Sequence, residues 1–197
     1  MSIYKLKSSF QDRLRPTVLR LAAAGVTANQ VTTLSAVISV LIGIMLWQYP
    51  ARVLFLLIPL WMFLRMALNA IDGMLAREHG QKSPLGGHLN EIGDVVSDAA
   101  LYAPFALVAP FSPVWIGAVI FLAALTEFAG VLGAVHGDGR RYDGPMGKSD
   151  RALVFGILGT WIAVLGVMPD WFRWILPIIC VMMAWTVVNR IRSGIGS

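Results

Sequence analysis

The chain has 197 residues, of which 57% are hydrophobic and only 14% are charged. Soluble domains usually carry about 25% charged residues, so this composition predicts a protein with much of its surface in contact with lipid. Its length suits one membrane domain, expected over 25–197 after an N-terminal region 1–24. The formal net charge of +5 could indicate a nucleic-acid partner, but the positions of the basic residues argue against one.

The N-terminal region 1–24 is predicted to form an amphipathic helix at the membrane interface. Ile3, Phe10 and Leu14 fall on one helical face, and basic residues lie between them. Such a helix would attract anionic membrane lipids. We expect it to support the membrane domain; a direct part in substrate binding is the alternative.

Six apolar segments follow, each close to the ~20 residues that cross a bilayer as a helix. They are 28–48, 53–77, 89–111, 113–135, 151–169 and 171–190. Thr27 has the pattern of an N-cap for the first segment. The expected fold class is therefore an all-α integral membrane protein of about six transmembrane helices.

Lysine and arginine predict the orientation of these segments. One side of the membrane would hold 13 of the 16 basic residues, in the N-terminal region, in the loops 78–88 and 136–150 with the flanking residues Arg77 and Arg151, and in the C-terminal end from Arg190. The other side would hold only Arg52 and Arg173, and Arg65 lies within a span. The positive-inside rule then places both termini in the cytoplasm, which accounts for the net charge without nucleic acid.

Polar residues gather where the second span ends and the third begins, on the predicted cytoplasmic side. Such residues are costly in a membrane and usually mark a functional site. Helical spacings of three and four predict two polar faces, made of Asn69, Asp72 and Ala76 on one helix and of Asn90, Glu91, Asp94 and Asp98 on the next. Because the connecting loop is short, these faces should converge, and their oxygen atoms suit Mg²⁺ or Mn²⁺.

The alternative is that these acids form buried salt bridges with Arg65 and Arg77. The acids outnumber the arginines at their level, and an unpaired carboxylate near the membrane is expensive. A metal ion would compensate the excess negative charge, so we favour a metal site.

The same residues resemble the signature of a known family, the CDP-alcohol phosphotransferases, which are six-helix membrane enzymes of phospholipid synthesis. The matching run is Asp72-Gly73, two residues, Ala76-Arg77, eight residues, Gly86, three residues, Asn90, three residues and Asp94. The spacing agrees throughout. The first and third aspartates of the family pattern, however, are Asn69 and Asn90 here.

The resemblance implies a transferase that moves a phosphatidyl or other phospho-alcohol group from a CDP-linked donor to an alcohol hydroxyl, releasing CMP. CDP-diacylglycerol is the expected donor. The family's two-metal centre implies Mg²⁺ or Mn²⁺ as cofactor. A homodimer is expected on the same ground. The expected location is a bacterial-type inner membrane, and the positive-inside rule places the site on its cytoplasmic side.

The resemblance also gives the signature residues expected roles. Asp72 would be a metal ligand, and Asp94 would be the general base that accepts the proton of the acceptor hydroxyl. Gly73, Ala76 and Gly86 would shape the cytidine pocket, and Arg77 would contact the donor phosphates.

The two asparagines leave the chemistry open. Asn69 and Asn90 can coordinate through their amide oxygens but offset no positive charge. Glu91 and Asp98 could supply charge to an altered two-metal site, or one metal could suffice. A non-catalytic protein that binds a lipid or nucleotide is the alternative to the transferase, and a transporter is disfavoured because the acids cluster near one face.

The loop between the fourth and fifth spans leads into a second cluster of basic residues, Arg140, Arg141, Lys148 and Arg151. They could hold an anionic acceptor such as a phosphorylated alcohol. Equally, they could reflect only positive-inside topology, with Ser149 or Asp150 capping the next helix. Glu127, midway along the fourth span, could face an internal cavity, but a bond to a neighbouring helix is the favoured prediction; Arg65 could pair with it or with the acids of the second span.

Overall fold

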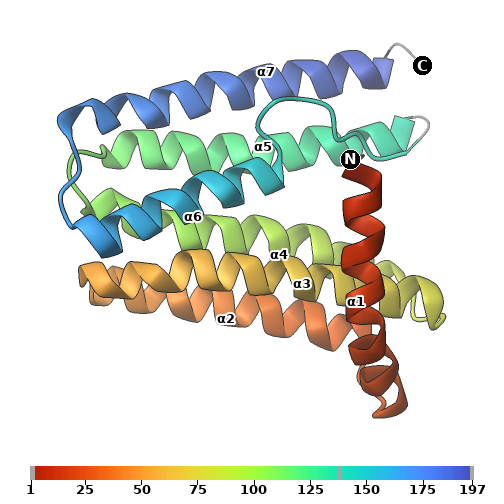
Figure 1. The fold of residues 1–197 in the computed structure, drawn as a ribbon. Helices are drawn as coiled ribbons and strands as arrows, with labels where there is room; N and C mark the ends of the chain where they lie inside the picture. The colour runs from red at the N-terminus through yellow and green to blue at the C-terminus, as the bar shows by residue number, and fades with distance from the viewer. Residues whose placement is uncertain (1–2, 137–138, 196–197) are drawn as a thin grey trace. The chain divides into compact units, whose positions relative to one another are not determined.

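The computed structural model describes residues 3–136 and 139–195, which form seven α-helices and three short 3₁₀ helices without a strand. Figure 1 shows their succession. They are α1 (Ile3–Ala23), α2 (Ala28–Gln48), η1 (Arg52–Leu56), α3 (Leu57–Glu78), α4 (Pro84–Tyr102), η2 (Ala103–Leu107), α5 (Pro113–His136), α6 (Lys148–Leu165), η3 (Asp170–Trp174) and α7 (Ile175–Ile195). The chain divides into a first unit, Met1–Ile38 with Trp61–Asp94, and a second unit, Ser39–Leu60 with Val95–Ser197.

Within residues 3–136 and 139–195, four helical segments are long and apolar enough to cross a membrane, and they correspond to the first, second, fourth and sixth predicted spans. They are Ala28–Gln48, Arg52–Glu78, Pro113–Val135 and Asp170–Ile195. Helices α4 and α6, with 19 and 18 residues, each contain three charged side chains. The all-α membrane fold is therefore supported by four helices, and spans at α4 and α6 stay a prediction.

The third predicted span begins earlier than its apolar pattern indicates. The segment 78–88 was expected to be a loop, but α4 begins within it, at Pro84. The Ser83 hydroxyl caps the helix by accepting a hydrogen bond from the Gly86 N–H at 3.0 Å. Proline suits the first helical position because the N–H that it lacks would have no helical partner there.

Two other boundaries also differ from the prediction. The third span was expected over 89–111, but α4 ends at Tyr102, and the missing N–H of Pro104 explains why the α-helical pattern stops. The fifth was expected over 151–169, but α6 ends before Gly166. That glycine has a left-handed φ of 73°, the usual conformation of a residue that terminates a helix.

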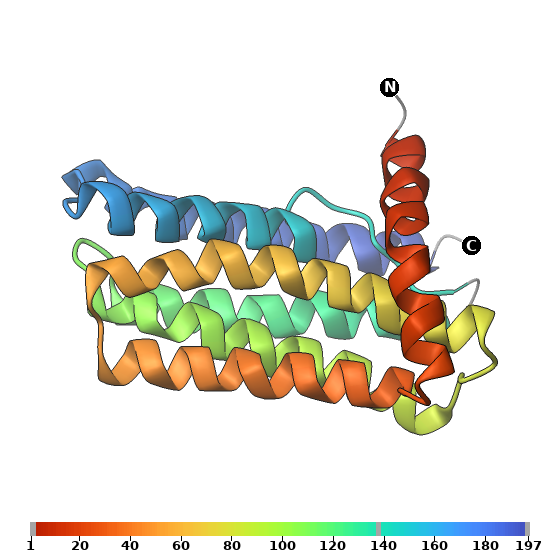
Figure 2. The ribbon, with the colours of Figure 1, turned by 60° about the horizontal axis from the view of Figure 1, so that its bottom comes forward.

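The first unit is held together by α1, which runs crosswise to α2 and α3 (Figure 2). Val18 of α1 is buried against Val31 of α2 and Met74 of α3, with Leu14 packed beside them. The helix predicted within 1–24 is thus present, and its place at the membrane surface stays a prediction. Thr27 caps α2 as predicted: its hydroxyl accepts from the Gln30 N–H at 3.2 Å, and the Gln30 side chain accepts from the Thr27 N–H at 2.9 Å.

The second unit has a core of buried aromatic rings contributed by η1, α4, η2 and α6. Tyr102 stacks on Phe155 with ring centroids 4.0 Å apart, and Phe105 meets Phe55 and Phe155 edge to face. Gly159 of α6 allows close contact, because a Cβ there would lie 2.9 Å from the Phe55 carbonyl oxygen. Helices α5 and α7 pack side by side (Figure 1). The loop that joins α5 to α6 is hydrogen-bonded to both of these helices.

Candidate functional site

The signature residues all lie in the first unit, near the end of α3 and the start of α4. Arg65 joins the two helices. Its Nη2 donates to the Asp94 carboxylate at 3.0 Å and to the Asp94 backbone carbonyl at 3.2 Å. Both side chains are buried. The approach of the two polar helices, predicted from the short loop, is therefore seen, and an arginine lies at the contact.

Asp72 is also buried and has a partner on a third helix. The Thr32 hydroxyl of α2 donates to Asp72 Oδ2 at 2.7 Å. A hydrogen bond to a carboxylate is shorter and stronger than one between neutral groups, so it fixes the direction of the Asp72 side chain. Thr32 was not among the predicted site residues; its only signal in the sequence is a polar residue one turn inside an apolar helix.

Polar side chains lie close to the backbone of two signature glycines, Gly73 and Gly86. A Cβ at Gly73 would be 2.9 Å from Arg77 Nη2, so the guanidinium lies over the backbone of α3. A Cβ at Gly86 would be 2.6 Å from the Asn29 side-chain oxygen, whereas one at Gly87 would meet nothing within 4 Å. Asn29 lies three residues before Thr32, so α2 presents both on one face toward the signature residues.

The remaining predicted ligands of the first unit are Asn69, Asn90 and Glu91, and all three are half-buried. Carboxylate and amide oxygens are the donor types that Mg²⁺ and Mn²⁺ prefer, so the donor chemistry fits such an ion. Among the described residues, no three or more Asp, Glu, His or Cys side chains are grouped as metal ligands. Ala76 packs against the hydrophobic core of this unit.

Asp98, predicted as a further metal ligand, belongs to the second unit and bonds to an arginine. Its Oδ2 accepts from Arg151 Nη2 at 3.1 Å, and both side chains are buried. Buried salt bridges, the alternative to a metal, are therefore present at Asp94 and Asp98. Their partners are Arg65, which was predicted as a partner of these acids, and Arg151, which was not.

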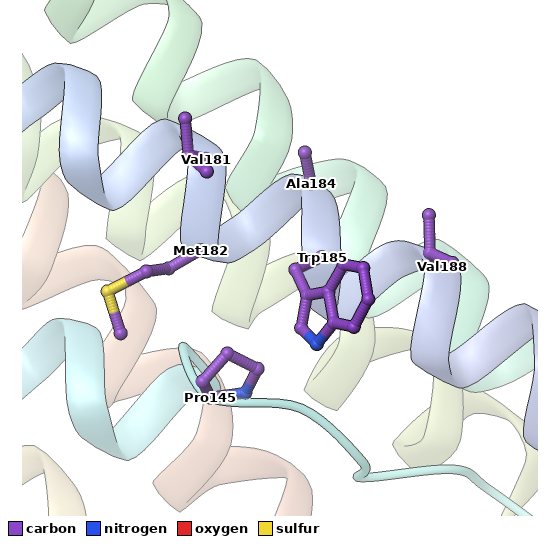
Figure 3. Close-up of a pocket in the computed structure, with 6 residues that line it drawn as sticks. All are labelled: Pro145, Val181, Met182, Ala184, Trp185 and Val188. Carbon is purple, nitrogen blue, oxygen red and sulfur yellow. The ribbon is translucent and has the colours of Figure 1, made fainter.

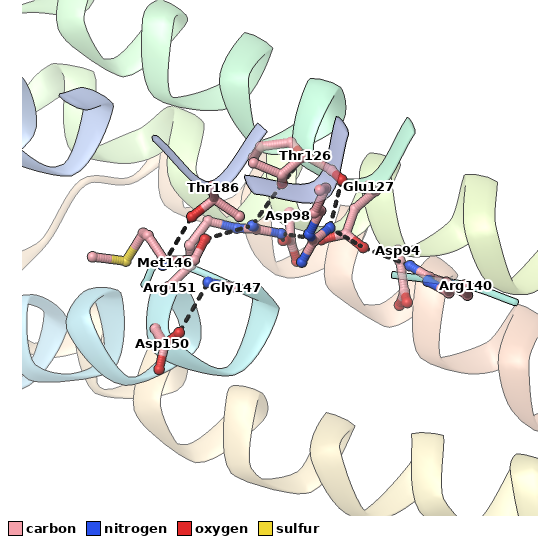
Figure 4. A network of polar contacts seen from close by, with 12 residues as sticks. Asp94, Asp98, Thr126, Glu127, Arg140, Met146, Gly147, Asp150, Arg151 and Thr186 are labelled. Atoms are coloured by element: carbon pink, nitrogen blue, oxygen red, sulfur yellow. Dashed lines mark hydrogen bonds and ion pairs between the residues drawn. The ribbon is translucent and has the colours of Figure 1, made fainter. Parts of the chain in front are cut away.

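Arg151 is the centre of a buried polar network in the second unit (Figure 4). Its side chain has no exposed surface. Nη1 donates to the Thr126 hydroxyl at 3.0 Å and to the Met146 carbonyl at 3.4 Å, and Nη2 donates to Glu127 Oε1 at 2.9 Å as well as to Asp98. This arginine thus joins α4, α5, α6 and the loop before α6.

Glu127 binds two further guanidinium groups. Its Oε2 accepts from Arg140 Nη2 at 2.5 Å and lies 3.8 Å from Arg190 Nη1 of α7. The predicted bonding of Glu127 to a neighbouring helix is confirmed by its contacts with Arg151 of α6 and Arg190 of α7. Arg65, a candidate partner of Glu127, pairs with Asp94 within the first unit.

The loop before α6 forms hydrogen bonds with α5 and α7. The Met146 N–H donates to the Thr186 hydroxyl at 3.1 Å, and the Arg141 N–H donates to the Gly130 carbonyl at 3.0 Å. Asp150 caps α6, as one alternative predicted, by accepting from the Gly147 N–H at 2.9 Å. Of the four predicted acceptor-binding residues, Arg140 and Arg151 therefore form ion pairs with Glu127. Lys148 is the first residue of α6.

A shallow cavity of about 460 Å³ lies on the second unit where α7 passes Pro145 (Figure 3). All its lining residues are apolar or aromatic: Pro145, Val181, Met182, Ala184, Trp185 and Val188. Such a lining suits a hydrocarbon chain and offers little to a nucleotide or phosphate.

A family model described as CDP-alcohol phosphatidyltransferase matches residues 25–188. Over 196 residues the chain is 44% identical to the inner membrane protein YnbA of Escherichia coli strain K12, covering 98% of this chain and 96% of that protein. It is 27% identical over 149 residues to the archaetidylinositol phosphate synthase of Aeropyrum pernix, covering 76% of this chain and 75% of that enzyme.

Solved structures share the fold. The phosphatidylinositol phosphate synthase of Mycobacterium tuberculosis with CDP-DAG bound has a TM-score of 0.74 at 18% identity, over 91% of this chain and 92% of that one. The structure of that synthase with manganese and citrate also has a TM-score of 0.74, covering 91% of this chain and 87% of that one. The family expected from the signature is thus confirmed by the family model and the curated relatives. This chain belongs to the CDP-alcohol phosphatidyltransferase family.

Proposed function

We propose that this protein is a membrane transferase that moves a phosphatidyl group from a CDP-linked lipid to an alcohol hydroxyl and releases CMP. The observation that carries the proposal is the arrangement of Asp72 and Asp94. They are buried carboxylates on neighbouring helices, each oriented by a partner of its own, Thr32 or Arg65. Carboxylates are expensive in such surroundings, so their retention at signature spacing favours a catalytic role.

The reaction exchanges one phosphorus–oxygen bond for another. The acceptor hydroxyl oxygen attacks the lipid-proximal phosphorus, while the bond from that phosphorus to the bridging oxygen breaks and CMP leaves with the bridging oxygen. Asp94 accepts the proton of the hydroxyl. By holding Asp94 Oδ1, Arg65 fixes the direction from which the carboxylate approaches the acceptor.

A divalent ion would be held by Asp72 and Asp94, together with the amide oxygens of Asn69 and Asn90. Bound there, Mg²⁺ or Mn²⁺ would stabilise the negative charge of the pyrophosphate and of the departing CMP. Two carboxylates match the charge of one divalent ion and offset only half that of two. Asp98 is bonded to Arg151, so we favour a single ion. Glu91, which is adjacent to Asn90 in the sequence, is the remaining acid that would add negative charge to the site.

CDP-diacylglycerol is the proposed donor, with Gly73, Gly86 and Arg77 at its nucleotide and phosphates. The CDP-DAG in the structurally similar synthase supports this choice. The relative with 44% identity is an inner membrane protein, which supports an inner-membrane location for this chain. Cytoplasmic termini and a cytoplasmic site follow from the lysine and arginine distribution, and a homodimer from the family resemblance.

The test is CMP release by the purified full-length protein from CDP-diacylglycerol with Mg²⁺ or Mn²⁺, across a panel of alcohols. The proposal predicts CMP release that depends on acceptor and metal, is lost in Asp94→Asn, and persists in Asp12→Asn. Asp12 provides the matched control because it is an exposed acid in the same unit. CMP formation that is equal in the two variants would contradict the role given to Asp94.

A non-catalytic binding protein is the second candidate. The neutral side chains of Asn69 and Asn90, together with the Arg65–Asp94 ion pair, favour it because they reduce the charge available for a metal. Metal-independent binding of CDP-diacylglycerol, without CMP release from any acceptor, would select this candidate over the transferase.

A further inference from the structure

Three guanidinium groups in the second unit converge on one carboxylate. Glu127 Oε1 lies 2.9 Å from Arg151 Nη2, and Oε2 lies 2.5 Å from Arg140 Nη2 and 3.8 Å from Arg190 Nη1. The Glu127 and Arg190 side chains are buried, and that of Arg140 is 18% exposed. The sequence alone indicated that Arg140 and Arg151 could receive the phosphate of a phosphorylated acceptor. The structure shows that an anion of the protein already lies among these guanidinium groups (Figure 4).

The hydrogen-bonding groups of these arginines are also largely engaged. Both terminal nitrogens of Arg151 donate to protein oxygens, including a second carboxylate, that of Asp98. Arg190 donates to the backbone carbonyls of Thr126 and Asp143. An incoming phosphate would therefore have to displace existing hydrogen bonds in order to bind.

We infer that Glu127 excludes phosphorylated acceptors and that the acceptor of this enzyme is an uncharged alcohol. The inference rests on the proposed function. A carboxylate and a phosphate are both negative, and both only accept hydrogen bonds when fully ionised, so they compete for the same guanidinium groups and repel one another. An uncharged hydroxyl compound meets no such repulsion. Glu127 is therefore the residue that determines acceptor specificity.

The test compares acceptors that differ only by a phosphate, glycerol with glycerol 3-phosphate and inositol with inositol phosphate. CMP release from CDP-diacylglycerol is measured for the wild type, Glu127→Gln and Glu127→Asp. The wild type should prefer the unphosphorylated member of each pair. Glu127→Gln, which removes the charge at nearly constant shape, should shift the ratio of kcat/KM values toward the phosphorylated member by about tenfold or more. Glu127→Asp retains the charge and should retain the preference.

A second readout, binding of inorganic phosphate by the full-length protein in detergent, does not depend on turnover. Calorimetry should detect phosphate binding in Glu127→Gln and none at the same concentrations in the wild type or in Asp170→Asn, which removes an exposed acid of the same unit. A wild-type preference for phosphorylated acceptors would overturn the inference, even if Glu127→Gln failed to fold. Equal phosphate binding by the wild type and Glu127→Gln would also overturn it, whereas absence of CMP with every acceptor would instead contradict the proposed function.

Discussion

Replacing Arg151 with methionine removes the cation of the buried network while retaining an unbranched apolar side chain. The substitution leaves the carboxylates of Asp98 and Glu127, the Thr126 hydroxyl and the Met146 carbonyl without this donor. Removing one partner of a buried ion pair costs about 3–5 kcal/mol. Since 1 kcal/mol changes the melting temperature of a chain of this size by roughly 2–4 °C, Arg151→Met should melt roughly 6–20 °C below the wild type.

The assay is thermal unfolding of the purified protein in detergent, followed by tryptophan fluorescence. Arg173→Met is the matched control, because its ion pair with Asp170 is exposed and should contribute nothing measurable. The double variant Arg151→Met/Glu127→Gln should be less destabilised than the sum of the two single variants, because one of the uncompensated carboxylates has been removed. A melting temperature for Arg151→Met equal to that of Arg173→Met would refute the stabilising role of the network.

Two predictions concern the donor site of the first unit. Thr32→Val removes the hydrogen bond to Asp72. Because a hydrogen bond to a charged group contributes about 1.5–3 kcal/mol, kcat/KM for CMP release should fall about 10- to 100-fold. The control Thr33→Val changes an exposed neighbour on α2 and should have little effect on kcat/KM. Gly86→Ala places a methyl group against the Asn29 side chain of α2. This overpacking should raise KM for CDP-diacylglycerol about tenfold. The control Gly87→Ala places its methyl group in open space and should have the KM of the wild type.

Local patterns in the sequence predicted much of the fold. The apolar run and the capping residue Thr27 give α2 the same bounds in the sequence and in the structure, Ala28–Gln48. The start of α4 differs from the prediction because the helix begins at the capping residues Ser83 and Pro84, whereas the continuous apolar pattern begins only at Leu89. The position of the signature residues at the ends of two helices was also predictable, since it depends on spacing along the chain alone.

The pairing of charged residues was not predictable in the same way. Periodicity shows which residues share a helix face, but not which helix that face will meet. Arg65 therefore had several candidate partners, and only the packing of α3 on α4 selects Asp94. Likewise, Arg151 had the sequence context of a surface loop cation, yet it is completely buried and bonded to residues of α4 and α5. A single sequence carries no local signal for such contacts.

The most direct test of the central claim is the stoichiometry of transfer. Purified protein is incubated with CDP-diacylglycerol labelled in its acyl chains, a divalent ion and the best acceptor from the panel, and both CMP and the new lipid are quantified over time. The account predicts one labelled lipid product for each CMP released, with both lost in Asp94→Asn. CMP without a matching lipid, or equal formation of both products by Asp94→Asn, would contradict it.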